Sequence, residues 1–131
     1  MRNTKLWVSL VAIIAIIGGF WAYTNQKSSA DSGKGSIALI TDGGGIDDKS
    51  FQQSAWEGMQ AWGKKHNLKQ GKGGYTYYES KTSADYTTNM EQASTNGFKT
   101  LFGIGFQLTD AINTEAKKNK NTNYVMIDDV A

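Results

Sequence analysis

The sequence predicts an α/β fold, a parallel sheet of about four strands with flanking helices. Short apolar or aromatic runs alternate with longer segments of helical periodicity, which is typical of strand–helix–strand units. The run Ile37–Ile40 is apolar without alternation, as in a strand that is buried on both faces. Acids or glycines follow several of the predicted strands, at the sheet edge where ligands bind in such folds.

The first half of the folded part predicts a strand, a helix and a second strand. Ile37–Ile40 is the first strand, and residues 42–48 form the loop after it. A helix is expected from Asp48 or Ser50 to about Lys65, because acids at its start and bases at its end suit the helix dipole. The aromatic, β-prone segment 75–78 is the second strand. The expected apolar stripe of the helix has helical spacing and consists of Phe51, Ala55, Met59 and Trp62.

The second half repeats this alternation. Residues 82–85 resemble a capping box with Asp in place of Glu, and the helix after them ends at Asn96-Gly97. Residues 99–103 form a third strand and residues 124–127 a fourth, with a helix between them. The alternation implies right-handed crossovers. The inward residues of the two helices are expected to be Tyr86, Met90 and Ala93, then Leu108, Ile112 and Ala116.

The amino terminus predicts an export or anchor segment. Arg2 and Lys5 precede the uncharged apolar run 6–23, which would be about 27 Å long as a helix, close to the thickness of a bilayer core. The basic residues should remain on the cytoplasmic side, so the rest of the chain should face outward. Two interpretations stay open: an uncleaved transmembrane anchor, or a signal peptide cut after Ala30. Residues 1–30 therefore form one region, with its linker, and 31–131 the ligand-binding one.

Composition excludes several classes of site. The chain has 131 residues and no Cys, so disulfides, thiol chemistry and thiolate metal sites are impossible. The net charge of +2 comes from the leader, since no acid precedes Asp31, and no clustered basic face suggests a nucleic-acid groove. No serine has a motif-placed base, which argues against an enzyme, and nothing implies a cofactor. The adjacent acids Asp47 and Asp48 are better explained by the helix start than by a metal.

The loop after the first strand is the most informative segment. Asp42 could accept hydrogen bonds from ligand hydroxyls or N–H groups, or it could only cap the turn. Residues 43–45 are glycines, which allow a close approach of the backbone. Phe51 could pack in the core or reach the cleft from the first helical turn. No Gly-Lys-Ser/Thr motif is present and acids surround the loop, so an uncharged ligand is favoured over a phosphate.

The run Asp-Gly-Gly-Gly-Ile-Asp-Asp-Lys-Ser-Phe, followed by Gln-Ser-Ala-Trp-Glu-Gly, resembles the basic membrane protein family. These bacterial surface lipoproteins are similar to periplasmic binding proteins of type I and include purine nucleoside receptors of ABC transporters. The resemblance continues through Tyr86, Asn89, residues 103–106 and residues 124–128. It implies part of the first of two lobes that close over a nucleoside, delivery to an ABC permease, and an extracytoplasmic, membrane-bound location.

The resemblance also implies roles for six residues. Asp42 and Asp128 should accept hydrogen bonds from the ligand, and Phe51 should stack on one face of the purine. Gly105 and Phe106 should line the pocket. Gln52 stands where the family usually has Asn, so its amide could still bond, from one methylene further out.

One further departure from the family and two alternatives remain. Phe20 occupies the place of the acylated Cys of a lipoprotein, so anchoring should come from the hydrophobic helix or not at all. The chain ends just past a strand, which suggests the first portion of a longer protein. It could therefore be a non-binding fragment or a surface interaction domain without a transport role. A hydrolase or transferase that uses the glycine loop is disfavoured by the missing phosphate-binding motif.

Overall fold

The computed structural model describes residues 35–47 and 49–129, which belong to one compact unit. The boundary between residues 30 and 31 stays a prediction, and the leader lies outside the described residues. Within the described part, no helix is both long and apolar enough to cross a bilayer. The elements in chain order are β1 (Ile37–Ile40), α2 (Phe51–Lys65), β2 (Tyr75–Tyr78), α3 (Ala84–Thr95), β3 (Thr100–Ile104), the 3-10 helix η1 (Phe106–Leu108), α4 (Thr109–Lys118) and β4 (Asn123–Ile127).

The four strands form the expected parallel sheet, which confirms the predicted fold class. Their order is β2-β1-β3-β4, and β1 pairs with β2 on one side and with β3 on the other. Ile40 is the partner of Tyr78 and of Gly103, and Ile104 is the partner of Ile127. Because all four strands run the same way, their carboxyl ends meet along one edge of the sheet.

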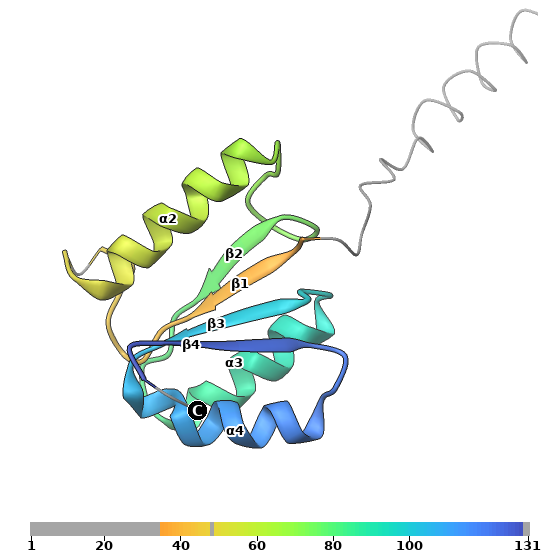
Figure 1. The fold of residues 1–131 in the computed structure, drawn as a ribbon. Helices are drawn as coiled ribbons and strands as arrows, with labels where there is room; N and C mark the ends of the chain where they lie inside the picture. The colour runs from red at the N-terminus through yellow and green to blue at the C-terminus, as the bar shows by residue number, and fades with distance from the viewer. Residues whose placement is uncertain (1–34, 48, 130–131) are drawn as a thin grey trace, which may run out of the picture. The chain divides into compact units, whose positions relative to one another are not determined.

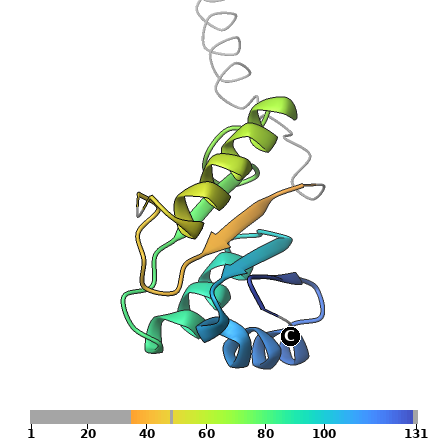
Figure 2. The ribbon, with the colours of Figure 1, turned by 60° about the vertical axis from the view of Figure 1, so that its left-hand side comes forward.

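Helices cover both faces of the sheet. Figures 1 and 2 show α2 on one face and α3 and α4 on the other. Strand β1 serves both cores by alternation: Ala38 and Ile40 pack with α3 and α4, whereas Leu39 packs with Trp56 and Met59 of α2. The sheet is therefore buried on both sides at its centre, which explains why β1 is apolar at every position.

The predicted apolar stripe of α2 is confirmed at Met59, whereas the other three buried positions lie one residue after those predicted. The buried positions are Gln52, Trp56, Met59 and Gly63, whereas Phe51 is 65% exposed. These four positions repeat at intervals of four, three and four residues, so they share one helix face. Gly63 belongs to this face because the ring of Tyr75 occupies the space that a Cβ would need. The first turn holds no acid, contrary to expectation, but Lys64 and Lys65 do lie in the last turn.

The predicted capping box at α3 forms only in part. The carboxylate of Asp85 accepts the backbone N–H of Thr82 at 2.8 Å and that of Lys81 at 2.9 Å. The hydroxyl of Thr82 also donates to this carboxylate, and the N-cap residue Ser83 makes no side-chain capping hydrogen bond. These hydrogen bonds to the charged form lower the pKa of Asp85, those from the Thr82 and Lys81 backbone amides being the main causes. One carboxylate thus organises the turn before the helix.

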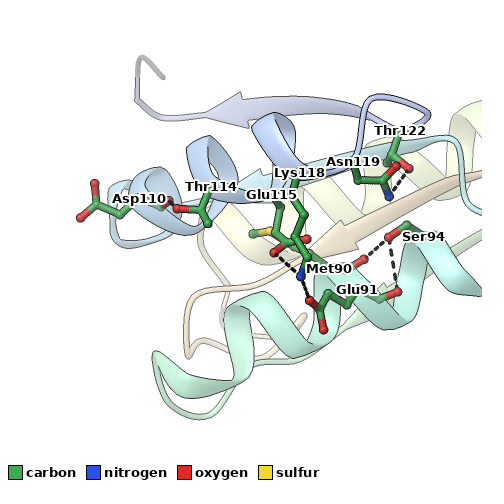
Figure 3. Close-up of polar contacts among 9 residues, drawn as sticks. All are labelled: Met90, Glu91, Ser94, Asp110, Thr114, Glu115, Lys118, Asn119 and Thr122. Carbon is green, nitrogen blue, oxygen red and sulfur yellow. Dashed lines mark hydrogen bonds and ion pairs between the residues drawn. The ribbon is translucent and has the colours of Figure 1, made fainter.

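An ionic cluster joins α3 to α4 on the face opposite α2. Figure 3 shows the ammonium of Lys118 between the carboxylates of Glu91 and Glu115, with Nζ 3.5 Å from the Glu115 carboxylate. Glu115 is only 2% exposed, so its charge depends on this one cation among the described residues. The hydrogen bond with Glu91 is the main cause of the raised pKa of Lys118.

On α4, Glu115 is buried where Ala116 was expected to be, and the other differences are small shifts at element ends. The third strand begins and ends one residue later than predicted, and β4 begins one residue earlier. The turn η1 precedes α4, and Thr109 continues directly from it. The later end of β3 places Gly105 and Phe106 immediately after the strand, where the site residues are expected.

Candidate functional site

Three predicted site residues follow three adjacent strands. Asp42 lies two residues after β1, Gly105 directly after β3 and Asp128 directly after β4. The connection from β1 leads to β2 on one side, and β3 pairs on the other side. In open parallel sheets, the point where the strand order reverses leaves a crevice outside the carboxyl ends. The sequence therefore places Asp42 at the switch point of this sheet.

The carboxylate of Asp42 is held by the first turns of the following segment. Its Oδ1 accepts a hydrogen bond from Nε2 of Gln52 at 2.5 Å and a weaker one from the Gly44 N–H at 3.4 Å. Gln52 is 4% exposed, although glutamine is normally a surface residue. The structure thus brings Gln52 and Asp42 together, and a direct contact of Gln52 with a ligand stays a prediction.

Gly105 and Asp42 lie in contact across the ends of β3 and β1. A Cβ added to Gly105 would lie 2.8 Å from Cγ of Asp42 and closer still to Oδ2. The φ of Gly105 is 100° and its ψ 136°, a conformation that side chains with a Cβ rarely adopt. Its N–H donates to the carbonyl of Ile127 at 3.2 Å, so the same residue connects β3 to the end of β4. Only glycine satisfies all of these requirements.

Tyr86 supports the main chain of Asp42 from the other face. Its hydroxyl donates to the carbonyl of Asp42 at 2.7 Å and lies 3.3 Å from Oε1 of Gln107. Burial, with the nearby charges of Asp42 and Asp85, raises the pKa of the Tyr86 phenol. The ring packs in the core between α3 and the sheet, so α3 fixes the position of the Asp42 main chain.

A second buried polar contact supports the start of the same loop. The buried hydroxyl of Thr41 accepts the N–H of Ser80 at 3.2 Å. The amide of Asn89 donates to the Ser80 hydroxyl at 3.0 Å and to the carbonyl of Glu79 at 3.1 Å. This network ties the ends of β1 and β2 to α3. The main chain is therefore held in place where the loop of residues 42–47 begins.

Two phenyl groups protrude from the segments that follow β1 and β3. Phe51 is 65% exposed and Phe106 is 66% exposed, and each is the first residue of its helix. The exposure of Phe51 excludes core packing, the alternative that its position in the sequence left open. An exposed aromatic ring offers a flat apolar surface on which a base can stack.

Asp128 is exposed and lies at the same edge as Asp42. Its φ is 75°, a left-handed conformation that Asp adopts more readily than most residues other than Gly. The next residue, Asp129, accepts a hydrogen bond from the hydroxyl of Thr109 at the start of α4. The carbonyl of Ile127, the last residue of β4, accepts a hydrogen bond from the Gly105 N–H. Asp128 is therefore the first residue after the contact between β3 and β4.

The alternatives to this edge are a metal site and an apolar hollow. No group of three or more His, Asp or Glu side chains among the described residues could hold a metal ion. A hollow of about 340 Å³ lies between α2 and the sheet and is lined by Ile37, Leu39, Ala55, Gly58, Met59, Trp62, Phe102 and Ile127. That lining contains no polar side chain to orient a hydroxyl-rich ligand. The hollow is the part of the sheet face beside α2.

The roles of Tyr86 and Gln52 beside Asp42 are not specified by the sequence patterns. Tyr86 is predicted only as an inward residue of its helix. A tyrosine on an inward helix face needs a partner for its hydroxyl, and that is the signal that could have found this contact. Gln52 is a polar residue one position after the predicted apolar residue Phe51. Its burial was not expected because the buried face of α2 begins one residue later than predicted.

Comparison with known proteins assigns the family. Residues 34–131 match the family model Bmp, described as ABC transporter substrate-binding protein PnrA-like. The chain belongs to the Bmp family. This confirms the resemblance, which was carried by the loop after β1 and the start of α2.

Three relatives share the sequence at substantial identity. The nucleoside-binding ABC transporter protein BmpA of Lactococcus lactis subsp. cremoris MG1363 is 44% identical over 136 residues, covering 99% of this chain and 38% of its own length. The CD4+ T-cell-stimulating antigens of Listeria innocua and Listeria monocytogenes are each 36% identical over 98% of this chain. They are covered over 38% and 37% of their length, so the chain spans well under half of these relatives.

A solved structure supports the fold alone. A crystallised fragment from Peptoclostridium difficile 630, provisionally described as a lipoprotein, superposes with a TM-score of 0.63. The match covers 75% of this chain and 76% of the fragment at 19% sequence identity. The arrangement of strands and helices thus recurs in a chain of very different sequence.

Proposed function

We propose that this chain provides one wall of a purine nucleoside site in an extracytoplasmic ABC transporter substrate-binding protein. The observation that carries the proposal is the group at the carboxyl edge of the sheet. There Asp42 offers a fixed carboxylate, Gly105 leaves room beside it and Phe51 exposes most of its ring. The name of the Lactococcus lactis relative, which is nucleoside-binding, is consistent with it.

The chemistry of this edge suits a neutral ligand with donors and a flat ring. Oδ1 of Asp42 already accepts two hydrogen bonds, whereas Oδ2 has no partner among the described residues. A ligand N–H or O–H could donate to Oδ2, and a base could stack on Phe51. Asp42 and Asp128 would repel a phosphate group, so nucleosides are preferred to nucleotides.

The other parts of the proposal follow from family membership. A substrate-binding protein of an ABC transporter delivers its ligand to a permease, which is the expected partner. Its place is outside the cytoplasmic membrane. Anchoring through residues 6–23, rather than through a lipid, rests on the sequence of the leader, which has no Cys.

The test is titration of the isotope-labelled full chain with guanosine and inosine, followed by amide NMR shifts. One wall supplies a stacked ring and a few hydrogen bonds, so a dissociation constant of about 1 mM, equivalent to about −4 kcal/mol, is expected. The shifts should map to residues 42–52, 105–106 and 128. Phe51→Ala should remove most of the affinity, because the stacking surface is lost.

The matched control is Val125→Ala, which shortens a different exposed apolar side chain, on β4. It should leave binding unchanged, and guanosine monophosphate should bind more weakly than guanosine. Shifts confined to the apolar hollow beside α2, or none at millimolar nucleoside, would refute the proposal. In the latter case the second candidate, a surface interaction domain without ligand, becomes the better explanation.

A further inference from the structure

Gln52 is the one polar side chain on the buried face of α2, which otherwise consists of Trp56, Met59 and Gly63. It lies in the first turn, next to the exposed Phe51. Its Oε1 is buried and has no hydrogen-bond partner among the described residues. A buried acceptor without a partner destabilises the folded state. An apolar side chain of the same length would avoid that cost, so the presence of glutamine here needs a reason other than packing.

The amide group of Gln52 has one orientation that the structure allows. Nε2 donates to Oδ1 of Asp42 at 2.5 Å. The reversed amide would set Oε1 against the carboxylate oxygen, and two acceptors at this distance repel each other. The orphaned Oε1 is therefore the consequence of directing the donor at Asp42. The contact joins an amide donor to a carboxylate, which is among the stronger kinds of hydrogen bond.

The length of the side chain matters to this contact. Replacing glutamine by asparagine withdraws the amide by one methylene, about 1.5 Å from standard bond lengths. The donor would then lie about 4 Å from Oδ1, beyond hydrogen-bonding distance. Asparagine on this backbone could not hold Asp42, so Gln52 is not interchangeable with the shorter amide.

On the other side of the carboxylate, Gly105 sets the second limit. Its Cα lies against Asp42, and the space that a Cβ would fill is taken by Oδ2. The carboxylate is thus bonded through Oδ1 and fitted against a bare backbone through Oδ2. Both constraints act on one rotamer of one side chain.

We propose that Gln52 is a positioning residue that fixes Asp42 in a single rotamer, so that Oδ2 is the acceptor presented to a ligand N–H or O–H. The link to ligand rests on the function proposed above. The positioning itself concerns only this chain in its free state. A polar side chain thus occupies the buried position 52 because its amide prevents rotation of the Asp42 carboxylate.

The first experiment needs no ligand. Three-bond couplings of the Asp42 Cγ to the backbone nitrogen and carbonyl carbon report its χ1 rotamer in the labelled full chain. The wild type should show one rotamer, whereas Gln52→Met and Gln52→Asn should both show averaging. The matched control is Gln60→Met, because the Gln60 side chain is exposed further along α2. It should leave the Asp42 couplings unchanged.

A second signature comes from the Gln52 side-chain amide. Its two proton resonances should move in Asp42→Asn, because Nε2 then faces a neutral amide in place of a carboxylate. A single Asp42 rotamer retained in Gln52→Met would overturn the proposal. So would Gln52 amide resonances that stay unchanged in Asp42→Asn. Loss of folding in Gln52→Met would contradict it too, because the substitution removes an unsatisfied oxygen and keeps the volume.

Binding provides the link to function through a double-mutant cycle with guanosine. Gln52→Met should weaken binding about tenfold when Asp42 is present and have no effect in the Asp42→Ala background. Equal losses in both backgrounds would mean that Gln52 acts independently of Asp42, and would refute a positioning role. Absence of guanosine binding in the wild type would refute the proposed function alone, since the couplings still decide the rotamer question.

Discussion

Gly105→Ala is the substitution that tests the geometry of the site most directly. A Cβ at this position would lie 2.8 Å from Cγ of Asp42 and 3.1 Å from its Cβ, and nearer still to Oδ2. The backbone is fixed on the other side, because the Gly105 N–H is bonded to Ile127. The side chain of Asp42 must therefore rotate away, and its bond to Gln52 must break.

Two costs contribute to the expected loss. Holding alanine at the φ of Gly105 costs about 1–3 kcal/mol. Losing the hydrogen bond between an amide and a charged carboxylate costs about 1.5–3 kcal/mol more. The free energy of unfolding should thus fall by about 2.5–6 kcal/mol, a large part of the 5–15 kcal/mol that is usual for a domain.

Urea unfolding followed by tryptophan fluorescence measures this loss, because Trp56 is buried against the sheet. Gly97→Ala is the matched control, since Gly97 has a φ of 91° but open space where its Cβ would lie. It should cost only about 1–2 kcal/mol, from backbone conformation alone.

The Asp42→Ala background separates the clash from the strain. With the carboxylate absent, Gly105→Ala should cost about 2 kcal/mol less than it does in the wild type, because no charged hydrogen bond remains to be broken. Equal losses at the two glycines, or an undiminished Gly105→Ala penalty without the carboxylate, would mean that Asp42 does not fill this space. The reasoning about the site would then fail.

Three further outcomes are expected from contacts around the site and between the helices. Tyr86→Phe should lower the free energy of unfolding by about 1–2 kcal/mol, measured in urea, because the Asp42 carbonyl loses its donor. Burial raises the pKa of Tyr86 and Tyr124, so the folded state keeps protons that the unfolded chain loses near pH 10. Stability should therefore be constant toward alkaline pH, fall as the pH rises through 10, and fall less steeply in Tyr86→Phe; an unchanged slope would contradict the assignment. Lys118→Met should lower the urea midpoint more than Lys117→Met does, because Glu115 then remains buried without its cation, and equal midpoints would exclude that dependence.

The fold follows from the sequence because its strands and helices obey simple periodicities. The run Ile37–Ile40 is apolar throughout because β1 lies at the centre of the sheet. Strands pair with it on both sides, and helices cover both of its faces. The phase of α2 was missed, because Phe51 has the hydrophobicity of a core residue and Gln52 does not. Composition alone cannot show that the Phe51 side chain is exposed and that the neighbouring Gln52 side chain is buried. That assignment depends on where the preceding loop starts the helix.

The location of the candidate site could be predicted from the sequence, whereas the contacts between its residues could not. The acid after β1 and the glycine after β3 could be placed at one edge from strand order and resemblance. The contact between Asp42 and Gly105 required the register of β1 with β3, and the bond to Gln52 required the helix phase. The residues that hold the site in shape come from segments far apart in sequence, so no local pattern describes them.

The departures from local preference gather at the same edge as the site. Three described residues other than glycine have a positive φ, and one of them, Asn67, follows the end of α2, where such a conformation is ordinary. The other two, Lys49 and Asp128, border the segments that follow β1 and β4. Gly105 adds a conformation that needs glycine, and Gln52 adds a buried oxygen without a partner. Each feature costs stability where it stands, and all are close to Asp42 in the sequence or follow a neighbouring strand. The buried hydroxyl of Tyr124, near the amino end of β4, also has no hydrogen-bond partner among the described residues, so such costs are not confined to this edge. Their concentration near Asp42 is consistent with the proposed binding site.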